Sequence, residues 1–449
     1  MKKLQLAVLA ALAASAPLSA QVEPLGLATA PAAAPDALEE GSLEKLIREV
    51  RRRRAGSVAK LAGPVETLVK QLDQVPADEP AEAVRVQEAL IALGTEIAPL
   101  LVPRIDPGAA SGGPEKRLAR RLVVVLNALP TRATTDALIQ MAREGSKSGR
   151  IHAMDVLGSS PDRGKVGPVL VDLFQHSSGD LRAQAVRSIA RLGGEENEAV
   201  LITALGESDP EVLRAVLAAL TDVASPAGRG RVRDLAGAPI AAAPLVAEIL
   251  AYYAALARTV GIEDEDVAAL VRLASHDAPS KDDRILVLAT IPTFADDVDS
   301  KTKKLFDPLL AVADDEIREE AEICLALLGD RNARRDVIKR YDELVSRNDS
   351  WAGAYEQRAA VLLKLREYDD AAKDFRRAIK IYANQGRTSQ LEDLYVELAR
   401  TYARDGNAKK AFDALEEAHL PRSVMKKLKD DPDFAEIVAH SRYGRVFDV

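Results

Sequence analysis

Cysteine is nearly absent from this 449-residue chain, which contains Cys324 alone. A single chain therefore cannot build a disulfide framework or a metal site made of several cysteines. Aromatic residues make up only 4 % of a chain that is 47 % hydrophobic. The core must consist of alanine and aliphatic residues, which favours helices over a β-sandwich or barrel. With 61 Lys plus Arg against 69 Asp plus Glu, the net charge of −8 excludes a global basic field for nucleic acid.

The first twenty residues have the pattern of a secretory signal peptide. Lys2 and Lys3 precede an apolar run of about a dozen residues, and small residues end the segment at Ser19 and Ala20. The run is too short to cross a hydrocarbon core about 30 Å thick. We therefore expect residues 1–20 to be removed, residues 21–41, rich in Ala and Pro, to form a flexible tether, and the mature chain to lack a transmembrane segment. Such a protein is periplasmic or extracellular, away from cytoplasmic ATP, nicotinamide cofactors and DNA.

An arginine recurs after residue 80 at a nearly constant spacing, inside or at the head of an apolar helical pattern. An apolar segment near Ile249 takes the place of one arginine in the series. The other members are Arg85, Arg117, Arg150, Arg182, Arg214, Arg284 and Arg318. Steps of about 32 to 35 residues indicate stacked supersecondary units.

Residues 179–206 show the content of one unit. Its first helix has one apolar face, formed by Leu181, Ala185, Ile189 and Leu192. Gly193 and Gly194 end this helix, and a second apolar run follows. The next unit opens with Asp209 and Pro210, a capping acid and a proline at the first helical position. Each unit is predicted to be two short antiparallel helices, which bury their apolar stripe only by stacking on neighbours.

These residues resemble the HEAT family of α-solenoids, in particular its short bacterial form. The family signature of an acid, an apolar residue and an arginine appears as Asp180-Leu181-Arg182 and again as Glu316-Ile317-Arg318. The resemblance covers residues 81–345, or about seven to eight repeats. Residues 42–80 are expected to form an N-terminal helical cap. The Pro- and Gly-rich stretch 225–244 departs from the pattern and leaves the repeat count there open.

The composition changes near residue 350, because most aromatic residues of the chain lie beyond it. Residues 352–384 resemble a tetratricopeptide repeat, and a second copy follows 40 residues later, with matching positions in the two copies at Tyr355, Ala359, Leu362, Ala371, Phe375 and Ala378, then Tyr395, Ala399, Tyr402, Ala411, Leu415 and Ala418. The resemblance implies two tetratricopeptide units at 346–420. Residues 421–449 resemble the short tail that closes such arrays, which would cover the last apolar face.

Residues with chemical reactivity form no recognisable catalytic or metal pattern. The five histidines include no pair four residues apart, and the acidic clusters lack the glycine and final glutamate of a calcium loop. Cys324 lies in an apolar helical run, which predicts a buried, inert thiol. No phosphate-binding loop or nucleophile elbow is present. We therefore predict no catalytic residue, no cofactor and no metal, and no nucleic-acid partner.

The tetratricopeptide resemblance also implies a peptide groove, because in that family the first helix of each pair lines it. Transferred position by position, the polar groove candidates are Glu356, Lys364, Asp393, Arg400 and Arg404. Arginine and lysine suit carboxylates, so the expected partner is an extended protein segment, possibly with acidic residues or a free C-terminus. The alternative is that these are ordinary surface charges.

The sequence thus predicts an all-α protein, an α-α superhelix of HEAT-like repeats continuing into tetratricopeptide repeats. Curved solenoids present long concave surfaces, so the first functional hypothesis is an exported, non-enzymatic binding scaffold or adaptor of a bacterial cell envelope. Two alternatives stay open. One is an enzyme similar to the HEAT-like bilin lyases and isomerases, and the other is a structural subunit that associates with itself. The identity of the partner and the oligomeric state are not predicted.

Overall fold

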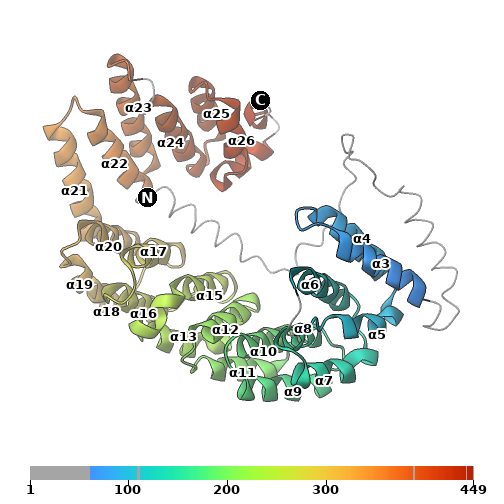
Figure 1. Cartoon of the computed structure of the whole chain (residues 1–449). Coiled ribbons are helices and arrows are strands. Elements are labelled where there is room, and N and C mark those ends of the chain that lie inside the picture. Colours follow the sequence, from blue (N-terminus) through green and yellow to red (C-terminus); the bar gives the residue numbers. More distant parts are fainter. Residues whose placement is uncertain (1–60, 109–111, 388–389, 441, 448–449) are drawn as a thin grey trace. The chain divides into compact units, whose positions relative to one another are not determined.

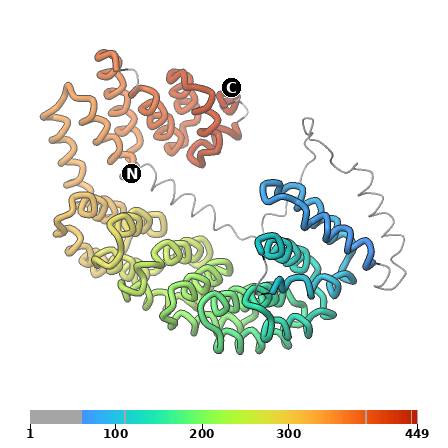
Figure 2. Tube along the Cα trace, in the orientation of Figure 1, coloured from blue at the N-terminus to red at the C-terminus, as the bar shows by residue number. Residues whose placement is uncertain are grey.

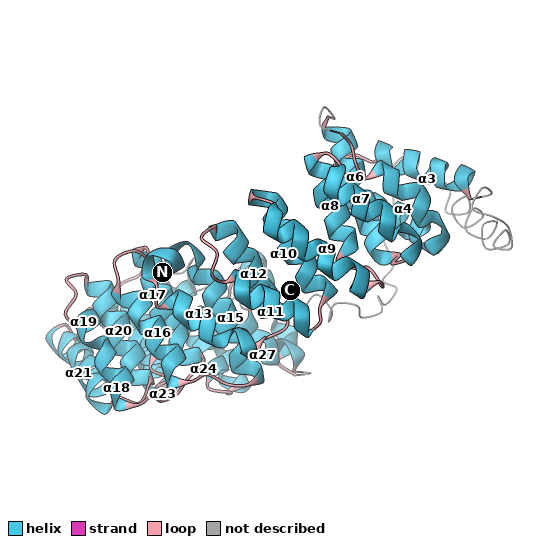
Figure 3. Cartoon of the chain, turned by 90° about the horizontal axis from the view of Figure 1, so that it is seen from below, coloured by secondary structure: helices cyan, strands magenta, loops and turns pink. Residues whose placement is uncertain are grey.

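The computed structural model describes residues 61–108, 112–387, 390–440 and 442–447. The predicted signal peptide and tether, and residues 42–60 of the predicted cap, lie outside these ranges. Within them every regular element is a helix, and no strand occurs (Figure 3). The predicted all-α fold class is confirmed for this part of the chain. The described chain divides into two compact units, which we treat separately.

The first unit contains residues 61–262 and Ala278–Asp283 of the described chain. Its helices form two rows, which Figures 1 and 2 show in blue to green. In one row, neighbours pack in the order α4 (Pro80–Ala92), α6 (Gly113–Ala128), α8 (Lys147–Leu157), α10 (Gly179–Leu192), α12 (Pro210–Asp222) and α15 (Val246–Thr259). The other row contains α5 (Ala98–Leu101), α7 (Thr135–Glu144), α9 (Arg163–His176), α11 (Glu195–Ala204) and α13 (Arg229–Ala236), while α3 (Ala62–Gln74) precedes α4 and α14 (Pro239–Ala242) precedes α15. This is the predicted stacking of short helix pairs.

The helix boundaries follow the capping residues of the sequence. Asp209 accepts a hydrogen bond from the Glu211 backbone N–H at 2.9 Å, and Pro210 is the first residue of α12. α10 ends at Leu192, and the φ of the following Gly193, 67°, is in the region that favours glycine. Local capping chemistry therefore sets the end of the first helix of the unit predicted at 179–206 and the start of the next unit.

Several of the periodic arginines join successive helices. In four of them the guanidinium donates to a backbone carbonyl at or just past the end of the preceding helix, where carbonyls lack intrahelical partners. The bonds are Arg150 Nε to Ala142 O (3.0 Å), Arg182 Nη1 to Ser177 O (3.5 Å), Arg284 Nε to Ala274 O (2.7 Å) and Arg318 Nη1 to Val312 O (2.9 Å). Arg85, the first of the series, is instead exposed and reaches only Glu82, at 3.4 Å. The sequence period therefore combines two different roles.

The irregular stretch 225–244 forms short broken helices. A 3₁₀ turn at Pro226–Gly228 leads into α13, and α14 and a second 3₁₀ turn at Ala243–Leu245 precede α15. The Tyr252 hydroxyl donates to the Ser225 carbonyl at 2.6 Å and fixes this segment against α15. Proline and glycine therefore shorten the helices here without interrupting the stack.

Among the described residues, the helical stretch Pro239–Thr259 is long and apolar enough to cross a membrane. The segments Pro80–Ala92 and Thr95–Arg104, which meet at a sharp bend, also meet this criterion of length and composition when they are taken together. Within the first stretch, 56 % of the most apolar window is buried, including Tyr252 and Tyr253, as in a core helix. The absence of a transmembrane segment stays a prediction.

The second unit contains Glu263–Asp277 and the chain from Arg284 onward. Its first helices are α16 (Asp264–Ser275), α17 (Lys281–Thr290), which starts in the first unit, α18 (Ser300–Lys303), α19 (Asp307–Leu310), α20 (Asp315–Leu327) and α21 (Arg331–Arg347). They are followed by the pairs α22 (Ala352–Lys364) with α23 (Tyr368–Asn384) and α24 (Leu391–Arg404) with α25 (Ala408–Glu417), and by α26 (Arg422–Lys429) and α27 (Ala435–Ala439). The division into units does not fall at residue 345, so the predicted repeat boundary there stays a prediction.

The positions that carry the tetratricopeptide resemblance lie between these helices. Ala359, Ala371 and Ala378 are completely buried, and Phe375 fills the adjoining space. The tail continues the same core, to which it contributes Met425, Leu428, Phe434, Ile437 and Phe447. The last helix pair is therefore closed by apolar side chains of residues 421–447. The tetratricopeptide identity itself stays a prediction.

Candidate binding surfaces

The predicted groove residues lie on two helices of the second unit. Glu356 and Lys364 belong to α22, and Asp393, Arg400 and Arg404 belong to α24. Lys364 Nζ forms an ion pair with Glu320 Oε2 of α20 at 2.5 Å. Its charge therefore serves contact between α20 and α22.

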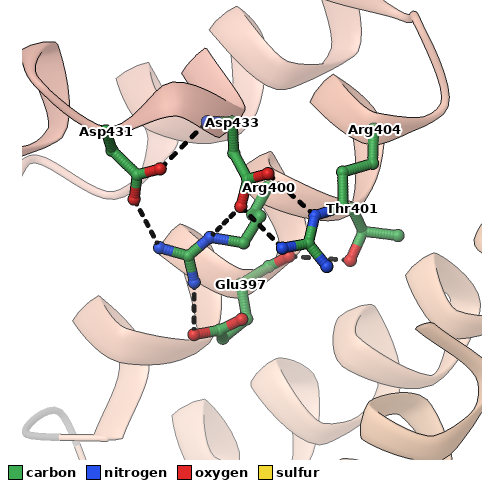
Figure 4. Close-up of polar contacts among 6 residues, drawn as sticks. All are labelled: Glu397, Arg400, Thr401, Arg404, Asp431 and Asp433. Atoms are coloured by element: carbon green, nitrogen blue, oxygen red, sulfur yellow. Dashed lines mark hydrogen bonds and ion pairs between the residues drawn. The ribbon is translucent and has the colours of Figure 1, made fainter. Parts of the chain in front are cut away.

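Arg400 and Arg404 bind two aspartates of the chain's own tail (Figure 4). Arg400 reaches Asp431 and Asp433, both at 2.9 Å, and also Glu397 at 2.7 Å. Arg404 donates to both carboxylate oxygens of Asp433, at 2.9 and 2.8 Å, in the parallel geometry that suits arginine and carboxylate. Burial alone would lower the pKa of Arg400, but the neighbouring Glu397 and Asp431 carboxylates outweigh it and raise the pKa.

An acidic segment thus occupies the arginines for which an acidic partner was predicted, and it belongs to the same chain. The expected type of contact is present, but these two arginines are not available to another molecule while the tail is in place. Sequence reasoning assigned Asp431 and Asp433 to a tail that covers an apolar face and missed their charge pairing. Arg400 is 31 residues before Asp431, and Arg404 is 29 residues before Asp433. No local sequence pattern indicates contacts at this separation.

The two acidic candidates differ in burial. Glu356 has one buried carboxylate oxygen with no hydrogen-bond partner among the described residues, while its side chain accepts a bond from Tyr382 that raises the pKa of that phenol. Asp393 is exposed in the first turn of α24, next to the positive end of the helix dipole. The five predicted residues therefore do not converge on one open cluster.

A second surface, not predicted from the sequence, lies between α6, α8 and α10 of the first unit. It is an open depression of about 270 Å³ lined by Arg120, Val123, Val124, Asn127, His152, Asp155, Ser159 and Arg191. Val124 is 54 % exposed and is one of several exposed aliphatic side chains of this unit. Three successive repeats therefore contribute to one partly apolar surface.

Asp155 connects the three helices beneath this depression. The Asn127 amide donates to the Asp155 carboxylate at 3.3 Å, and Ser159 donates to Asn127 at 3.0 Å. Arg191 binds the same carboxylate and donates to the Asp155 carbonyl at 3.1 Å. Arg120, in contrast, donates only from Nε to the Lys116 carbonyl, and no described carboxylate pairs with it. One cation of the depression is neutralised, and the other is available.

Cys324 and His152 are both held by the surrounding protein. Cys324 is buried, and burial raises the pKa of its thiol well above the ordinary value. His152 is held by the Ile105 carbonyl, to which Nδ1 donates at 2.7 Å. No group of three or more His, Cys, Asp or Glu residues in the described ranges has the geometry of a metal site.

Solved structures similar to this chain have low sequence identity to it. An engineered protein from the Northeast Structural Genomics Consortium is 17 % identical, with a TM-score of 0.32, over 90 % of this chain and 96 % of that one. A chain of a Kap95:Nup1 complex is 12 % identical, with a TM-score of 0.40, over 85 % of this chain and 55 % of that one. Importin beta is 11 % identical, with a TM-score of 0.29, over 91 % of this chain and 69 % of that one.

No curated protein matches the sequence of this chain. The family profile of HEAT repeats matches residues 167–243, which begin within α9 and end after α14. This segment lies inside the range 81–345 in which the sequence resembles HEAT repeats, and the resemblance is confirmed there. The chain therefore contains HEAT-like repeats at residues 167–243.

Proposed function

We propose that this protein is an exported, non-enzymatic scaffold that holds a protein partner on its stacked helix pairs. The main support is the depression between α6, α8 and α10, which is lined by both the exposed Val124 and Arg120, a cation without a described carboxylate partner. Stacked helix pairs present extended surfaces, which suits them to holding partners. Export rests on the signal-peptide pattern of residues 1–20 alone.

A protein segment fits this depression better than a free small molecule does. Pockets for small molecules usually bury most of the surface of the ligand, whereas this depression is open to solvent. An aliphatic side chain would contact Val123 and Val124, and a carboxylate beside it would pair with Arg120. The Asp155 network fixes the three helices, so the surface is largely formed before binding.

The groove on α22 and α24 is a second part of the proposal. A partner segment entering along Glu356, Lys364, Asp393, Arg400 and Arg404 would have to displace Asp431 and Asp433 from the arginines. Because several tail residues are in the hydrophobic core, this displacement would be unfavourable. We therefore place the primary partner contact on the first unit.

A photo-crosslinking amino acid at Val124, in the full chain produced in its native cells, tests the proposal. We expect one protein to be crosslinked, with a yield that Arg120→Glu lowers and Arg231→Glu, an exposed cation on α13, leaves unchanged. Crosslinks to a second copy only would favour the self-associating subunit, and no crosslinked protein at all would contradict the scaffold. Export is tested by sequencing the N-terminus of the mature protein, which we expect to begin at Gln21.

A further inference from the structure

One face of α21 is open to solvent and strongly basic. Six residues at the spacing of a single helix face line an open depression of about 450 Å³: Arg331, Arg334, Arg335, Ile338, Lys339 and Asp342. In a helix of a compact domain, residues at this spacing form one face, and that face is usually apolar and packed against the core. Of the 17 residues of α21, only Val337 and Val345 are buried. Ile338 is partly buried against the neighbouring core, so the part of this face that is open to solvent is the edge formed by Arg331, Arg335 and Lys339.

Three of these cations form no ion pair with another helix in the described part of the chain. Arg331 and Lys339 form no hydrogen bond or ion pair with any described residue. Arg335 reaches only its sequence neighbour Asp336, at 3.3 Å, and both side chains are about two-thirds exposed. We call Arg331, Arg335 and Lys339 the α21 basic strip.

The remaining polar side chains of the depression are already paired. Arg334 donates to the Glu367 carboxylate at 2.6 Å and to the Leu365 carbonyl at 3.2 Å. Asp342 accepts from Arg358 of α22 at 2.9 Å. These contacts attach α21 to the following helix pair and leave the basic strip as the open part of the face.

The position of the strip is electrostatically unfavourable within the chain. Arg331 and Arg335 lie in the first two turns of α21, near the positive end of its dipole, where acids rather than bases are stabilising. Successive members are four residues apart, and like charges at this spacing destabilise a helix. Departures from local rules without internal compensation are typical of functional sites.

We propose that the α21 basic strip binds an acidic amphipathic helix of a partner protein. This deepens the proposed scaffold function and rests on it for the class of partner, although it uses a separate surface. Members of the strip are spaced by about 6 Å along the helix axis, because four residues rise by about 1.5 Å each. Glutamates at positions i, i+4 and i+8 of a partner helix have the same spacing. A leucine between them would lie in the depression beside Ile338.

A peptide titration with the full-length protein tests this proposal. The probe is a fluorescent helical peptide with Glu at i, i+4 and i+8 and Leu at i+3 and i+7. Its binding is measured by fluorescence anisotropy at low and at high salt. Two comparison peptides have Gln in place of Glu, or Ser in place of Leu. We expect both substitutions to weaken binding, the first by about tenfold or more.

Charge reversal on two helices makes the test specific to α21. The triple variant Arg331→Glu, Arg335→Glu and Lys339→Glu is expected to weaken binding of the acidic peptide about tenfold or more. The matched control is Arg422→Glu, Lys426→Glu and Lys427→Glu on α26, three exposed cations with the same change in charge, which should change affinity less than about twofold. Because the strip is exposed and its one ion pair, Arg335 with Asp336, is also exposed, its reversal should leave the thermal midpoint unchanged or raise it. A milder variant with Gln at the three α21 positions guards against an unexpected folding defect.

Two results would overturn the inference. If the two triple variants lost the same affinity for the acidic peptide, binding would depend only on the net charge of the protein. Equal binding of the Ser peptide, or of a polyanion such as polyglutamate without leucine, would mean that the face is a general anion-binding surface rather than a helix-docking site. Crosslinking at Val124 does not depend on the α21 basic strip, so failure here and failure of the scaffold proposal can be told apart.

Discussion

Arg404 binds Asp433 through two parallel hydrogen bonds, Nε to Oδ1 at 2.9 Å and Nη2 to Oδ2 at 2.8 Å. Asp433 precedes Phe434, whose ring is completely buried in the core of the second unit. The ion pair and the buried ring are adjacent in sequence, so they attach the tail to α24 together. The charges predicted to bind a partner therefore stabilise the end of the chain.

Asp433→Asn is expected to destabilise the C-terminal helices. The substitution removes the carboxylate shared by Arg400 and Arg404, and hydrogen bonds to charged groups contribute about 1.5–3 kcal/mol. We expect the free energy of unfolding, measured by urea titration followed by fluorescence of Trp351, to fall by about that amount. Asp405→Asn, an exposed aspartate just after α24, is the control and should have no measurable effect. Equal stabilities of the two variants would show that the pair with Arg404 contributes nothing.

Much of the fold was predictable because its determinants are local. The start of α12 follows from Asp209 and Pro210, and the buried face of α23 from the spacing of Ala371, Phe375 and Ala378. Small residues at fixed spacing allow two helices to approach closely, and this requirement is visible in a single sequence.

The binding surfaces were less predictable because they depend on contacts between distant residues. The depression at Val124 combines side chains from three helices, and the role of Asp155 depends on Asn127 and Arg191, which are 28 and 36 residues away. Arg400 was predicted to be available, but the sequence does not indicate which carboxylates reach it in three dimensions. For α21, the basic composition was visible, but which of its cations have partners depends on α20 and α22.

Stability at acid pH is expected to depend on Asp106. Burial alone would raise the pKa of this carboxyl, but hydrogen bonds from the Ser146 side chain and the Gly108 backbone outweigh burial and lower it. A carboxyl with a lowered folded pKa contributes fully above its unfolded value of about 3.9, and the contribution is lost as the pH falls through the folded pKa. The difference in unfolding free energy between wild type and Asp106→Asn should therefore narrow below about pH 4. A difference in unfolding free energy between wild type and Asp106→Asn that stays constant with pH would contradict the assignment.

Two glycine substitutions are expected to have opposite effects. A Cβ at Gly149 would lie 2.3 Å from the Asp106 carboxylate carbon, so Gly149→Ala should displace that carboxylate and destabilise the first unit by about 1–3 kcal/mol. A Cβ at Gly230 of α13 has nothing within 4 Å, and Gly230→Ala should stabilise by about 0.5–1 kcal/mol. Urea unfolding of both variants checks the signs. A stabilising Gly149→Ala would show that the approach of Asp106 to α8 is not required.

Two arginines of the same sequence period are expected to differ in their effect on stability. The side chain of Arg284 is only 9 % exposed, and its Nε donates to the Ala274 carbonyl at the end of α16. The side chain of Arg85 is 68 % exposed and has only a weak contact with Glu82. Methionine preserves the length and apolar stem of arginine but removes its donors, so Arg284→Met leaves a buried carbonyl unpaired and should destabilise by about 1–3 kcal/mol. Arg85→Met should stay within about 0.5 kcal/mol of wild type, because isolated exposed ion pairs contribute little. Equal losses for the two variants, measured by urea unfolding, would mean that the periodic arginine has the same role in every repeat and that the carbonyl contact is not what stabilises the stack.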